Sequence, residues 1–191
     1  DRVTKEENPD GTTQSFDYDK NGNLTKKSDE NGNSATYEYD SRNRKIITTD
    51  PAGNTKQYFY DGNGNTIETQ DYRGNRWKYL YDMGNRLVET RDPVGSIYRY
   101  DYDASGRITS TTDPNGNTSQ VTFYDDTDLT KSVSDPYGNE IFYNYDNRRR
   151  LVLQVNQNGD STKYDYDADG NLTSIIDPAG KKIEMDYDDA G

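Results

Sequence analysis

Aromatic and polar residues alternate in short stretches along this chain. In Tyr37-Glu38-Tyr39, two aromatic side chains flank one polar residue, which is the pattern of a β-strand with its aromatic residues on one face. The same spacing occurs at Phe16/Tyr18, Tyr37/Tyr39, Tyr58/Tyr60, Tyr79/Tyr81, Tyr100/Tyr102, Tyr143/Tyr145 and Tyr164/Tyr166. The residues between these pairs are mostly polar. The pattern therefore predicts strands with one aromatic face, and we expect the tyrosines to supply most of the apolar contact area.

A Tyr-Asp dipeptide ends each of these stretches and recurs at a fixed interval. The spacing is 21 residues, except for one interval of 22. The dipeptides are Tyr18-Asp19, Tyr39-Asp40, Tyr60-Asp61, Tyr81-Asp82, Tyr102-Asp103, Tyr124-Asp125, Tyr145-Asp146, Tyr166-Asp167 and Tyr187-Asp188. A period of this size predicts a repeat protein, in which each unit is stabilised by its neighbours. We interpret these residues as the structural motif of the repeat.

Two turn signals divide each repeat. Midway between the Tyr-Asp pairs, sequences such as Asp50-Pro51-Ala52-Gly53 have the residue order of a type I turn, with a glycine that accepts positive φ. We call all turns of this series Asp-Pro turns, including those that lack the proline. The second turn follows each Tyr-Asp pair, and three residues after its Asp most repeats carry Gly or Asn, which tolerate left-handed backbone. Arg149 is the clear departure from that rule.

Two turns per repeat leave two strands of about six or seven residues, and turns this short join antiparallel neighbours. The predicted fold is all-β, an antiparallel β-meander of about nine 21-residue hairpin repeats with about 17 or 18 strands. Such a sheet would extend about 80 Å, and its twist would coil it into a spiral or open barrel. We expect residues 1–191 to form a single array, a fragment of a longer shell. The extra residue of the sixth repeat, between Asp113 and Tyr124, is expected in a β-bulge.

The composition adds limits to this fold. Only 28% of the residues are hydrophobic, 18 are tyrosines, and the net charge is −12, so we expect a folded but thin sheet with no deep core. The absence of cysteine and histidine excludes disulfides, the usual zinc ligand sets, and Cys-His or Ser-His catalysis. The acidic charge disfavours nucleic acid and anionic membrane surfaces as partners. No apolar run approaches the ~20 residues needed to span a bilayer, so no membrane insertion is expected.

The repeat unit resembles the YD or Rhs (rearrangement hotspot) repeat. Tyr102-Asp103-Ala104-Ser105-Gly106-Arg107-Ile108-Thr109, followed by Asp113-Pro114-Asn115-Gly116-Asn117, carries this resemblance most clearly, and it extends over the whole chain. The resemblance implies a β-sheet wound into a hollow shell. In bacterial Rhs and insecticidal toxin-complex proteins the shell encloses a toxic C-terminal domain, and in animal teneurins it forms an extracellular adhesion module. The self-cleaving segment of the family continues Asp-Pro-x-Gly with leucine, whereas this chain has Asn54, Ser96, Asn117, Asn139 or Lys181 there.

Three other chemistries deserve comparison with a purely structural role. Asp17-x-Asp19-x-Asn21-Gly22 and Asp165-x-Asp167-x-Asp169-Gly170 resemble the first half of an EF-hand loop, but the twelfth positions are Ser28 and Ile176 instead of glutamate. Turn-capping aspartates explain the same pattern. Paired carboxylates could suggest glycoside hydrolysis, but a repeat gives each Asp nearly the same surroundings. Tyrosine rings on an exposed face could stack on sugars. We predict no catalytic residue, no metal site and no cofactor.

The leading functional hypothesis is a non-enzymatic wall segment of a β-sheet shell that encapsulates a toxin domain in a secreted or surface bacterial protein. Its expected partners are the remainder of the same shell and an enclosed C-terminal domain, with edge-to-edge self-association as a further possibility. The alternative is an extracellular adhesion or carbohydrate-binding module whose partners would be glycans. Both hypotheses predict an extracellular or cell-surface location.

Overall fold

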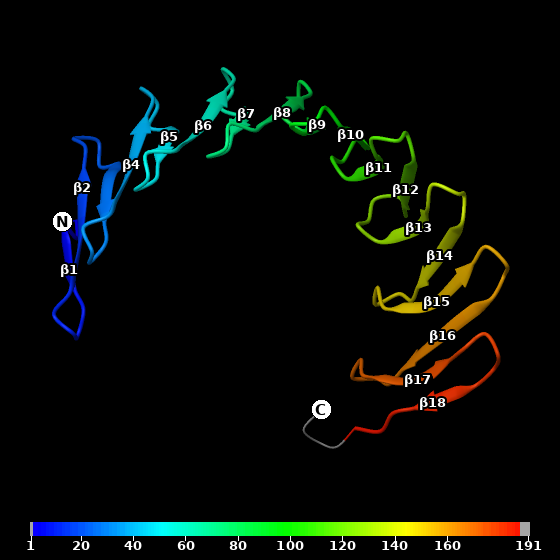
Figure 1. Ribbon diagram of the computed structural model, residues 1–191. Coiled ribbons are helices and arrows are strands. Elements are labelled where there is room, and N and C mark those ends of the chain that lie inside the picture. The colour runs from blue at the N-terminus through cyan, green and yellow to red at the C-terminus, as the bar shows by residue number, and fades with distance from the viewer. Residues whose placement is uncertain (1, 188–191) are drawn as a thin grey trace. The chain divides into compact units, whose positions relative to one another are not determined.

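The computed structural model describes residues 2–187, which form strands and turns without a helix (Figure 1). The prediction of an all-β fold is confirmed, with 18 strands. The first nine are β1 (Lys5–Glu7), β2 (Thr13–Tyr18), β3 (Leu24–Ser28), β4 (Ser34–Tyr39), β5 (Lys45–Thr49), β6 (Thr55–Tyr60), β7 (Thr66–Gln70), β8 (Arg76–Tyr81) and β9 (Leu87–Arg91). The others are β10 (Ile97–Tyr102), β11 (Ile108–Thr112), β12 (Thr118–Phe123), β13 (Thr130–Ser134), β14 (Glu140–Tyr145), β15 (Leu151–Asn156), β16 (Ser161–Tyr166), β17 (Leu172–Ile176) and β18 (Lys182–Glu184).

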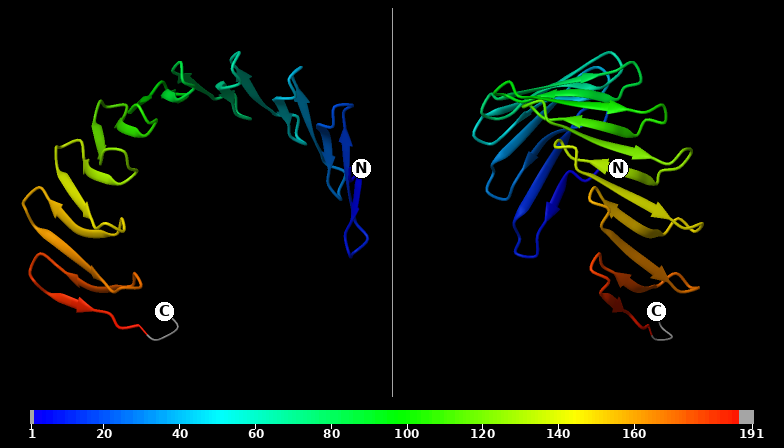
Figure 2. Two further views of the ribbon diagram at one scale, coloured as in Figure 1. Left: turned by 180° about the vertical axis from the view of Figure 1, so that it is seen from behind. Right: turned by 90° about the vertical axis from the view of Figure 1, so that its right-hand side faces the viewer.

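The chain divides into two compact units, Asp1–Tyr98 and Arg99–Gly191. In the first unit, strands β1 to β9 pair in chain order, each antiparallel to the next. In the second unit, residues 99–102 of β10 and strands β11 to β18 do the same. Figure 2 shows this within the second unit, where the hairpins of β14 to β17 follow one another with turns at both ends of the strands. The predicted meander of hairpins is confirmed, and the coiling of the sheet stays a prediction.

Burial follows the predicted alternation of side chains. In β2, Phe16 and Tyr18 are partly buried while Asp17 between them is exposed, and β4, β14 and β16 repeat this pattern. We call the face that carries these aromatic pairs the tyrosine face. No hydrophobic residue among those described is fully buried, and the two residues that are buried, Ser132 and Ser174, are polar. The expectation of a thin sheet without a deep core is therefore confirmed.

The Asp-Pro turns have the predicted geometry. In each one the glycine N–H donates to the carbonyl of the Asp or Asn three residues earlier, as from Gly53 to Asp50 at 3.0 Å and from Gly116 to Asp113 at 3.0 Å. All nine glycines take positive φ, between 80° and 92°. The positive-φ glycines are Gly11, Gly32, Gly53, Gly74, Gly95, Gly116, Gly138, Gly159 and Gly180.

The turns after the Tyr-Asp pairs also contain a left-handed residue. It is Gly22, Asn43, Gly64, Asn85, Gly106 and Gly170 in six of them, as the sequence predicts. Arg149, which looked like a departure, adopts the same conformation with φ of 65°. The turn geometry therefore overrides the side-chain preference at that position, at a cost of ~1 kcal/mol.

The sixth repeat corrects the predicted register. Phe123, not Tyr124, ends strand β12, and it lies seven residues after Gly116, as Tyr39 lies seven after Gly32. The extra residue therefore falls in the turn, where the Tyr124 N–H donates to the Leu129 carbonyl, one residue farther along than in the other repeats. The placement of the extra residue in a strand between Asp113 and Tyr124 was wrong, because a turn absorbs an insertion without moving strand side chains to the other face.

Bulges occur instead in every hairpin that a Tyr-Asp turn closes. In β2 and β3, Asp17 pairs with Lys26 and Tyr18 pairs with Leu24, so Thr25 has no partner in the register. The same shift precedes the last residue of β4, β6, β8, β10, β12, β14 and β16. The bulge is thus a regular part of the repeat.

Candidate functional site

Most turns are held by the aspartate carboxylate that opens them. Asp50 Oδ1 accepts the N–H groups of Ala52 at 2.9 Å and Asn54 at 2.8 Å, while Oδ2 accepts the Asn54 side chain at 2.9 Å. The Tyr-Asp turn at Asp19 repeats these contacts with Asn21 and Asn23. The two turns of a repeat therefore share one structure: an Asp, a left-handed residue three positions later, and a fourth residue whose side chain usually donates to the Asp. Local side-chain to backbone bonds of this kind favour turns.

In the turns named below, these hydrogen bonds lower the pKa of the aspartate carboxyl. In seven turns the main cause is the side-chain amide of the Asn four residues later, namely at Asp19, Asp29, Asp50, Asp61, Asp71, Asp113 and Asp135. In a second group the pKa is lowered mainly by the backbone N–H of the residue four positions later. This group consists of Asp40, Asp82, Asp103, Asp146 and Asp167. Hydrogen bonds to the ionised form stabilise the charge, so these aspartates stay ionised to a lower pH.

The Tyr-Asp turns also contact one another along one edge of each unit, and we call this stack of turns the turn ladder. Arg44 joins two of them in the first unit. Its Nε and Nη2 each lie 2.7 Å from Asp40 Oδ2, and its Nη1 donates to the Asp61 carbonyl at 3.1 Å. The guanidinium also lies over the Tyr60 ring, 4.5 Å from the centroid. One side chain thus holds its own turn and contacts the next repeat through a charge-assisted bond and a cation–π interaction.

Asparagine makes a different contact in the alternate repeats. Asn23 Nδ2 donates to Asn43 Oδ1 at 2.8 Å, and Asn65 Nδ2 donates to Asn85 Oδ1 at 2.8 Å. Thus Asn in one turn faces Asn in the next, whereas Arg44 faces Gly64. Gly64 has no side chain, and a Cβ there would lie 3.9 Å from Arg44 Nη1. These three pairs of neighbouring turns therefore carry matched residues, Asn with Asn or Arg with Gly, and we call this pairing the matching rule.

The second unit repeats the arginine form of the ladder. Arg150 Nε donates to Asp146 Oδ2 at 2.8 Å, its Nη1 donates to the Asp167 carbonyl at 3.1 Å, and its guanidinium lies over the Tyr166 ring at 4.6 Å. The facing residue of the next turn is Gly170, as the matching rule requires. In the sequence the corresponding positions of the next two turns are Asn171 and Gly191, a combination outside this rule, and Gly191 lies outside the described residues.

Tyrosine hydroxyls join each repeat to the preceding one, whereas the arginines join it to the following one. The Tyr39 hydroxyl donates to the Leu24 carbonyl at 2.9 Å, and the Tyr60 hydroxyl donates to the Lys45 carbonyl at 2.7 Å. Each acceptor is the first residue of the second strand in the preceding repeat. Tyr18, Tyr166 and Tyr187 make the same kind of bond, to Val3, Leu151 and Leu172. Burial raises the pKa of Tyr39, Tyr60, Tyr81 and Tyr145.

The structure places most of the sequence-predicted motif residues together. The tyrosines at 18, 39, 60, 81, 102, 145 and 166 end the first strand of a hairpin, and the aspartate after each opens the turn. Tyr187 lies beyond β18, and Asp188 lies outside the described residues. Tyr124-Asp125 is displaced by one position. Phe123 stands where the other repeats have tyrosine and lies under Arg107, 4.2 Å from its guanidinium carbon.

The displacement of Tyr124 creates a local site on the second unit. Its hydroxyl lies 2.7 Å from Asn144 Oδ1 and 2.9 Å from the Tyr143 carbonyl oxygen, which share its single proton, and its ring packs edge-on against Tyr145 at 6.2 Å. Tyr124, Asn144 and Tyr145 line a pocket together with Asp125, Thr127, Leu129 and Asp146. The single interval of 22 residues in the Tyr-Asp series, where the others are 21, was the only sequence signal of this feature.

The alternative chemistries find less support in this geometry. Asp19 uses both carboxylate oxygens within its own turn, and Asp17 is exposed on the strand before it. Over residues 2–187, no group of three or more His, Cys, Asp or Glu residues is arranged to hold a metal ion. Nor does that range contain a helix long and apolar enough to cross a membrane.

Sequence reasoning missed the residues that join the turns. The predicted motif ended at the Tyr-Asp pair and the glycine, whereas the residue four positions after the Asp makes the contact to the next repeat. The sequence does contain a signal for this contact, because the position is Asn or Arg in seven repeats: Asn23, Arg44, Asn65, Arg86, Arg107, Arg150 and Asn171. All of these side chains are long enough or polar enough to donate beyond their own turn.

The fold and the turn ladder define a tandem β-hairpin repeat protein. The family model described as RHS Repeat matches residues 1–33, 18–55, 60–97, 84–118, 150–182 and 166–191. The chain therefore belongs to the RHS repeat family, as the repeat unit suggested, and it is a structural repeat module. Comparison with curated protein sequences gave no match.

Among solved structures, the chain is similar to a TcdB2-TccC3 crystal structure at 14% identity and a TM-score of 0.48, covering 91% of this chain and 12% of that one. A structure of the Photorhabdus luminescens Tc holotoxin pore matches at 13% identity and a TM-score of 0.45, covering 87% and 14%. A porin-like protein from Bacteroides uniformis matches at 15% identity and a TM-score of 0.24, covering 86% and 81%. The chain spans about an eighth of the length of the TcdB2-TccC3 chain.

Proposed function

We propose that this chain is a non-enzymatic wall segment of a β-sheet shell that encloses a toxic domain in a secreted or surface-exposed bacterial protein. Membership in the RHS repeat family supports the proposal, and the turn ladder is the observation that carries it. A sheet without buried hydrophobic residues among those described depends on contacts between neighbouring repeats. Arg44 and Arg150 make such contacts at one edge, and the tyrosine hydroxyls make them across the tyrosine face.

The proposed partners follow from the same role. The remainder of the shell would continue the pairing at β1 and β18, and the enclosed domain would lie inside. Both strands have three residues and carry charged side chains, Lys5-Glu6-Glu7 and Lys182-Ile183-Glu184. Short, charged edge strands disfavour indiscriminate pairing, so edge-to-edge association would be specific to matching repeats.

The test is made on the intact parent protein. Mass spectrometry of the secreted parent and its co-purifying fragments should find a C-terminal piece that stays bound to the array and resists protease. Replacing Arg44 and Arg150 with alanine should expose that piece to protease. Replacing Arg73 with alanine is the matched control, since Arg73 occupies an exposed Asp-Pro turn. An accessible C-terminal domain in the unaltered parent, or a parent without such a domain, would refute the shell.

A second candidate function is carbohydrate binding, and the pocket at Tyr124 and Tyr145 favours it. Aromatic rings beside Asp125, Asn144 and Asp146 combine stacking surfaces with hydrogen-bond acceptors. A glycan array probed with the chain tests this role. Binding that Tyr145→Ala removes would support an adhesion module, and an array without any bound glycan would eliminate it.

A further inference from the structure

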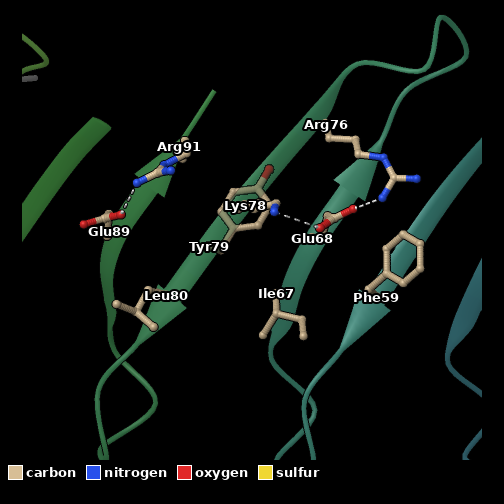
Figure 3. Close-up of a pocket in the computed structure, with 9 residues that line it drawn as sticks. All are labelled: Phe59, Ile67, Glu68, Arg76, Lys78, Tyr79, Leu80, Glu89 and Arg91. Carbon is tan, nitrogen blue, oxygen red and sulfur yellow. Dashed lines mark hydrogen bonds and ion pairs between the residues drawn. The ribbon is translucent and has the colours of Figure 1, made fainter. Parts of the chain in front are cut away.

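The first unit carries an apolar strip on the face opposite the tyrosine face. In most hairpins the residue before the last aromatic of the first strand is polar, namely Asp17, Glu38, Asp101, Thr122, Asn144 or Asp165. In β6 and β8 this residue is Phe59 and Leu80, and both are exposed, Leu80 to 58%. Ile67, which lies at the bulge of β7, is also exposed. Figure 3 shows the three side chains in one row across the strands.

A row of charged residues runs beside this apolar strip. Its members pair across successive strands, Glu68 of β7 with Lys78 of β8 and Lys78 with Arg91 of β9. Phe59 pairs with Glu68 at one end of this row, and Arg76 lies next to Glu68 (Figure 3). The carboxylates and cations form ion pairs, Arg76 with Glu68 at 2.5 Å, Lys78 with Glu68 at 3.9 Å, and Arg91 with Glu89 at 3.9 Å. Together these residues line a single depression in the surface.

The charges that a partner would meet in this depression are positive. The side chains of Arg76, Lys78 and Arg91 are 50% to 64% exposed, whereas those of Glu68 and Glu89 are 18% and 24% exposed. The carboxylates thus lie beneath the cations and orient them. This arrangement is unusual on a chain of net charge −12, which as a whole repels anions.

We propose that this surface, Phe59, Ile67 and Leu80 with Arg76, Lys78 and Arg91, is a docking site for a polypeptide segment with apolar side chains along one side and carboxylates along the other. Phe59 is in register with Lys78, two residues before Leu80, so Phe59 and Leu80 are about 10 Å apart across the strands and about 7 Å apart along them, or roughly 12 Å in all. Residues i and i+7 or i+8 on one face of an α-helix are separated by about 10.5 to 12 Å, so two helical turns reach both ends of the strip. Carboxylates on the adjoining flank then meet the three cations.

Charge favours such a segment over other occupants. An anionic membrane or a nucleic acid is repelled by the remaining acidic surface and presents more charge than three cations can neutralise. An acidic protein segment needs only a few carboxylates over the cationic row. The apolar strip supplies contact area, and the charged row fixes orientation and selects the partner.

The experiment uses the 191-residue chain and a synthetic fluorescent peptide of about 14 residues. The peptide has leucines at i, i+3, i+4 and i+7 and glutamates on one flank of the helix. Anisotropy should show binding that weakens as salt rises. The variants Phe59→Asp and Leu80→Asp should each lower affinity about tenfold or more. Aspartate is the native residue at the equivalent positions 17, 101 and 165, so the fold tolerates it.

Charge reversal tests the contribution of the charged row. Lys78→Glu together with Arg91→Glu should reduce affinity at least tenfold. Lys163→Glu is the matched control, because Lys163 occupies the same position in β16 as Lys78 in β8, and it should leave binding unchanged. Circular dichroism of each variant shows whether the sheet is intact. The measurement requires neither a shell nor a cargo, so it can succeed or fail independently of the proposed function.

Several results would overturn the proposal. Equal binding of a scrambled peptide, or of one with lysines in place of the glutamates, would remove the charge argument. Binding to phosphatidylserine vesicles without binding to the peptide would assign the surface to lipid. A dimer in analytical ultracentrifugation that Leu80→Asp abolishes, with no peptide binding, would assign it to a second copy of the chain.

Discussion

The pairing of residues between neighbouring turns can be tested by converting one type of contact into the other. Arg44 faces Gly64, whereas Asn23 faces Asn43, so Arg44→Asn and Gly64→Asn together should rebuild the asparagine contact. Each single variant should destabilise the array, because it leaves one partner without its match. The double variant should recover part of the loss.

The magnitude follows from the contacts of Arg44. Its ion pair with Asp40, both side chains about three-quarters buried, contributes ~0.5–1 kcal/mol. The bond to the Asp61 carbonyl adds about 1 kcal/mol, and the contact with the Tyr60 ring adds ~0.5–1 kcal/mol. Asparagine retains the bond within its own turn, so Arg44→Asn should cost about 1.5 kcal/mol. Gly64→Asn should cost about 1 kcal/mol, since φ there is 99°.

In the double variant, the two introduced amides can form the hydrogen bond that joins Asn23 to Asn43, with a coupling energy of ~1 kcal/mol. Urea unfolding gives the free energies, and hydrogen exchange across residues 40–65 locates the effect, since a repeat array can unfold in parts. A control pair far from the turn ladder, Arg73→Asn with Gly95→Asn, should show no coupling. If the double variant at Arg44 and Gly64 loses the sum of the two single losses, the matching rule is refuted.

Four further outcomes follow from the same structure. The pKa is lowered for turn carboxyls such as Asp19 and Asp40, so the stability they contribute is complete above the unfolded pKa near 4 and is lost as pH falls through the folded values. The melting temperature should therefore drop below about pH 4, and a rise would show that relief of the net charge of −12 dominates. Arg149→Gly should stabilise the chain by ~1 kcal/mol in urea unfolding, since it removes a left-handed arginine. Phe123→Tyr places a hydroxyl where other repeats bond a backbone carbonyl and should gain ~0.5–1 kcal/mol by the same assay; no gain would indicate that the register at Phe123 differs. Trypsin should cleave the bond after Arg73 faster than the bond after Arg42, because of the two only Arg42 is held to the next turn, by a bond to the Gly62 carbonyl at 2.7 Å. The two cleavage rates should differ about fivefold for each 1 kcal/mol of difference in local opening free energy.

Local features of this fold were predictable from the sequence because each one depends on a few neighbouring residues. Residues within a single hairpin determine the Asp-Pro turns, their positive-φ glycines and the aromatic alternation in β4. The sixth repeat was misread because Tyr124-Asp125 matches the motif in letters, while the distance from Gly116 sets the strand register. Periodicity counted along the Tyr-Asp series could not distinguish an insertion before Tyr124 from one after it.

Contacts between repeats were not predictable by the same means, because they join residues 15 to 22 positions apart. The tyrosine face was expected from the sequence, but the bond from the Tyr60 hydroxyl to Lys45 requires the stacking of one hairpin on another. The docking surface has the same origin. Phe59 and Leu80 look like two unrelated exceptions in the sequence, and only the pairing of β6 to β9 brings them beside Lys78 and Arg91.

The two edges of each unit have the same turn structure, but they differ in the hydrogen bonds that join neighbouring repeats. At the Tyr-Asp edge, arginine or asparagine four residues after the Asp extends to the next turn, as Arg150 does to Asp167. At the Asp-Pro edge, the equivalent residue is usually asparagine, such as Asn54, whose amide donates to its own Asp50. The contact between Gln14 and Glu30 there is long, at 3.4 Å. Adjacent repeats are therefore held together more firmly at one edge, and bending of the sheet should be resisted least at the Asp-Pro edge.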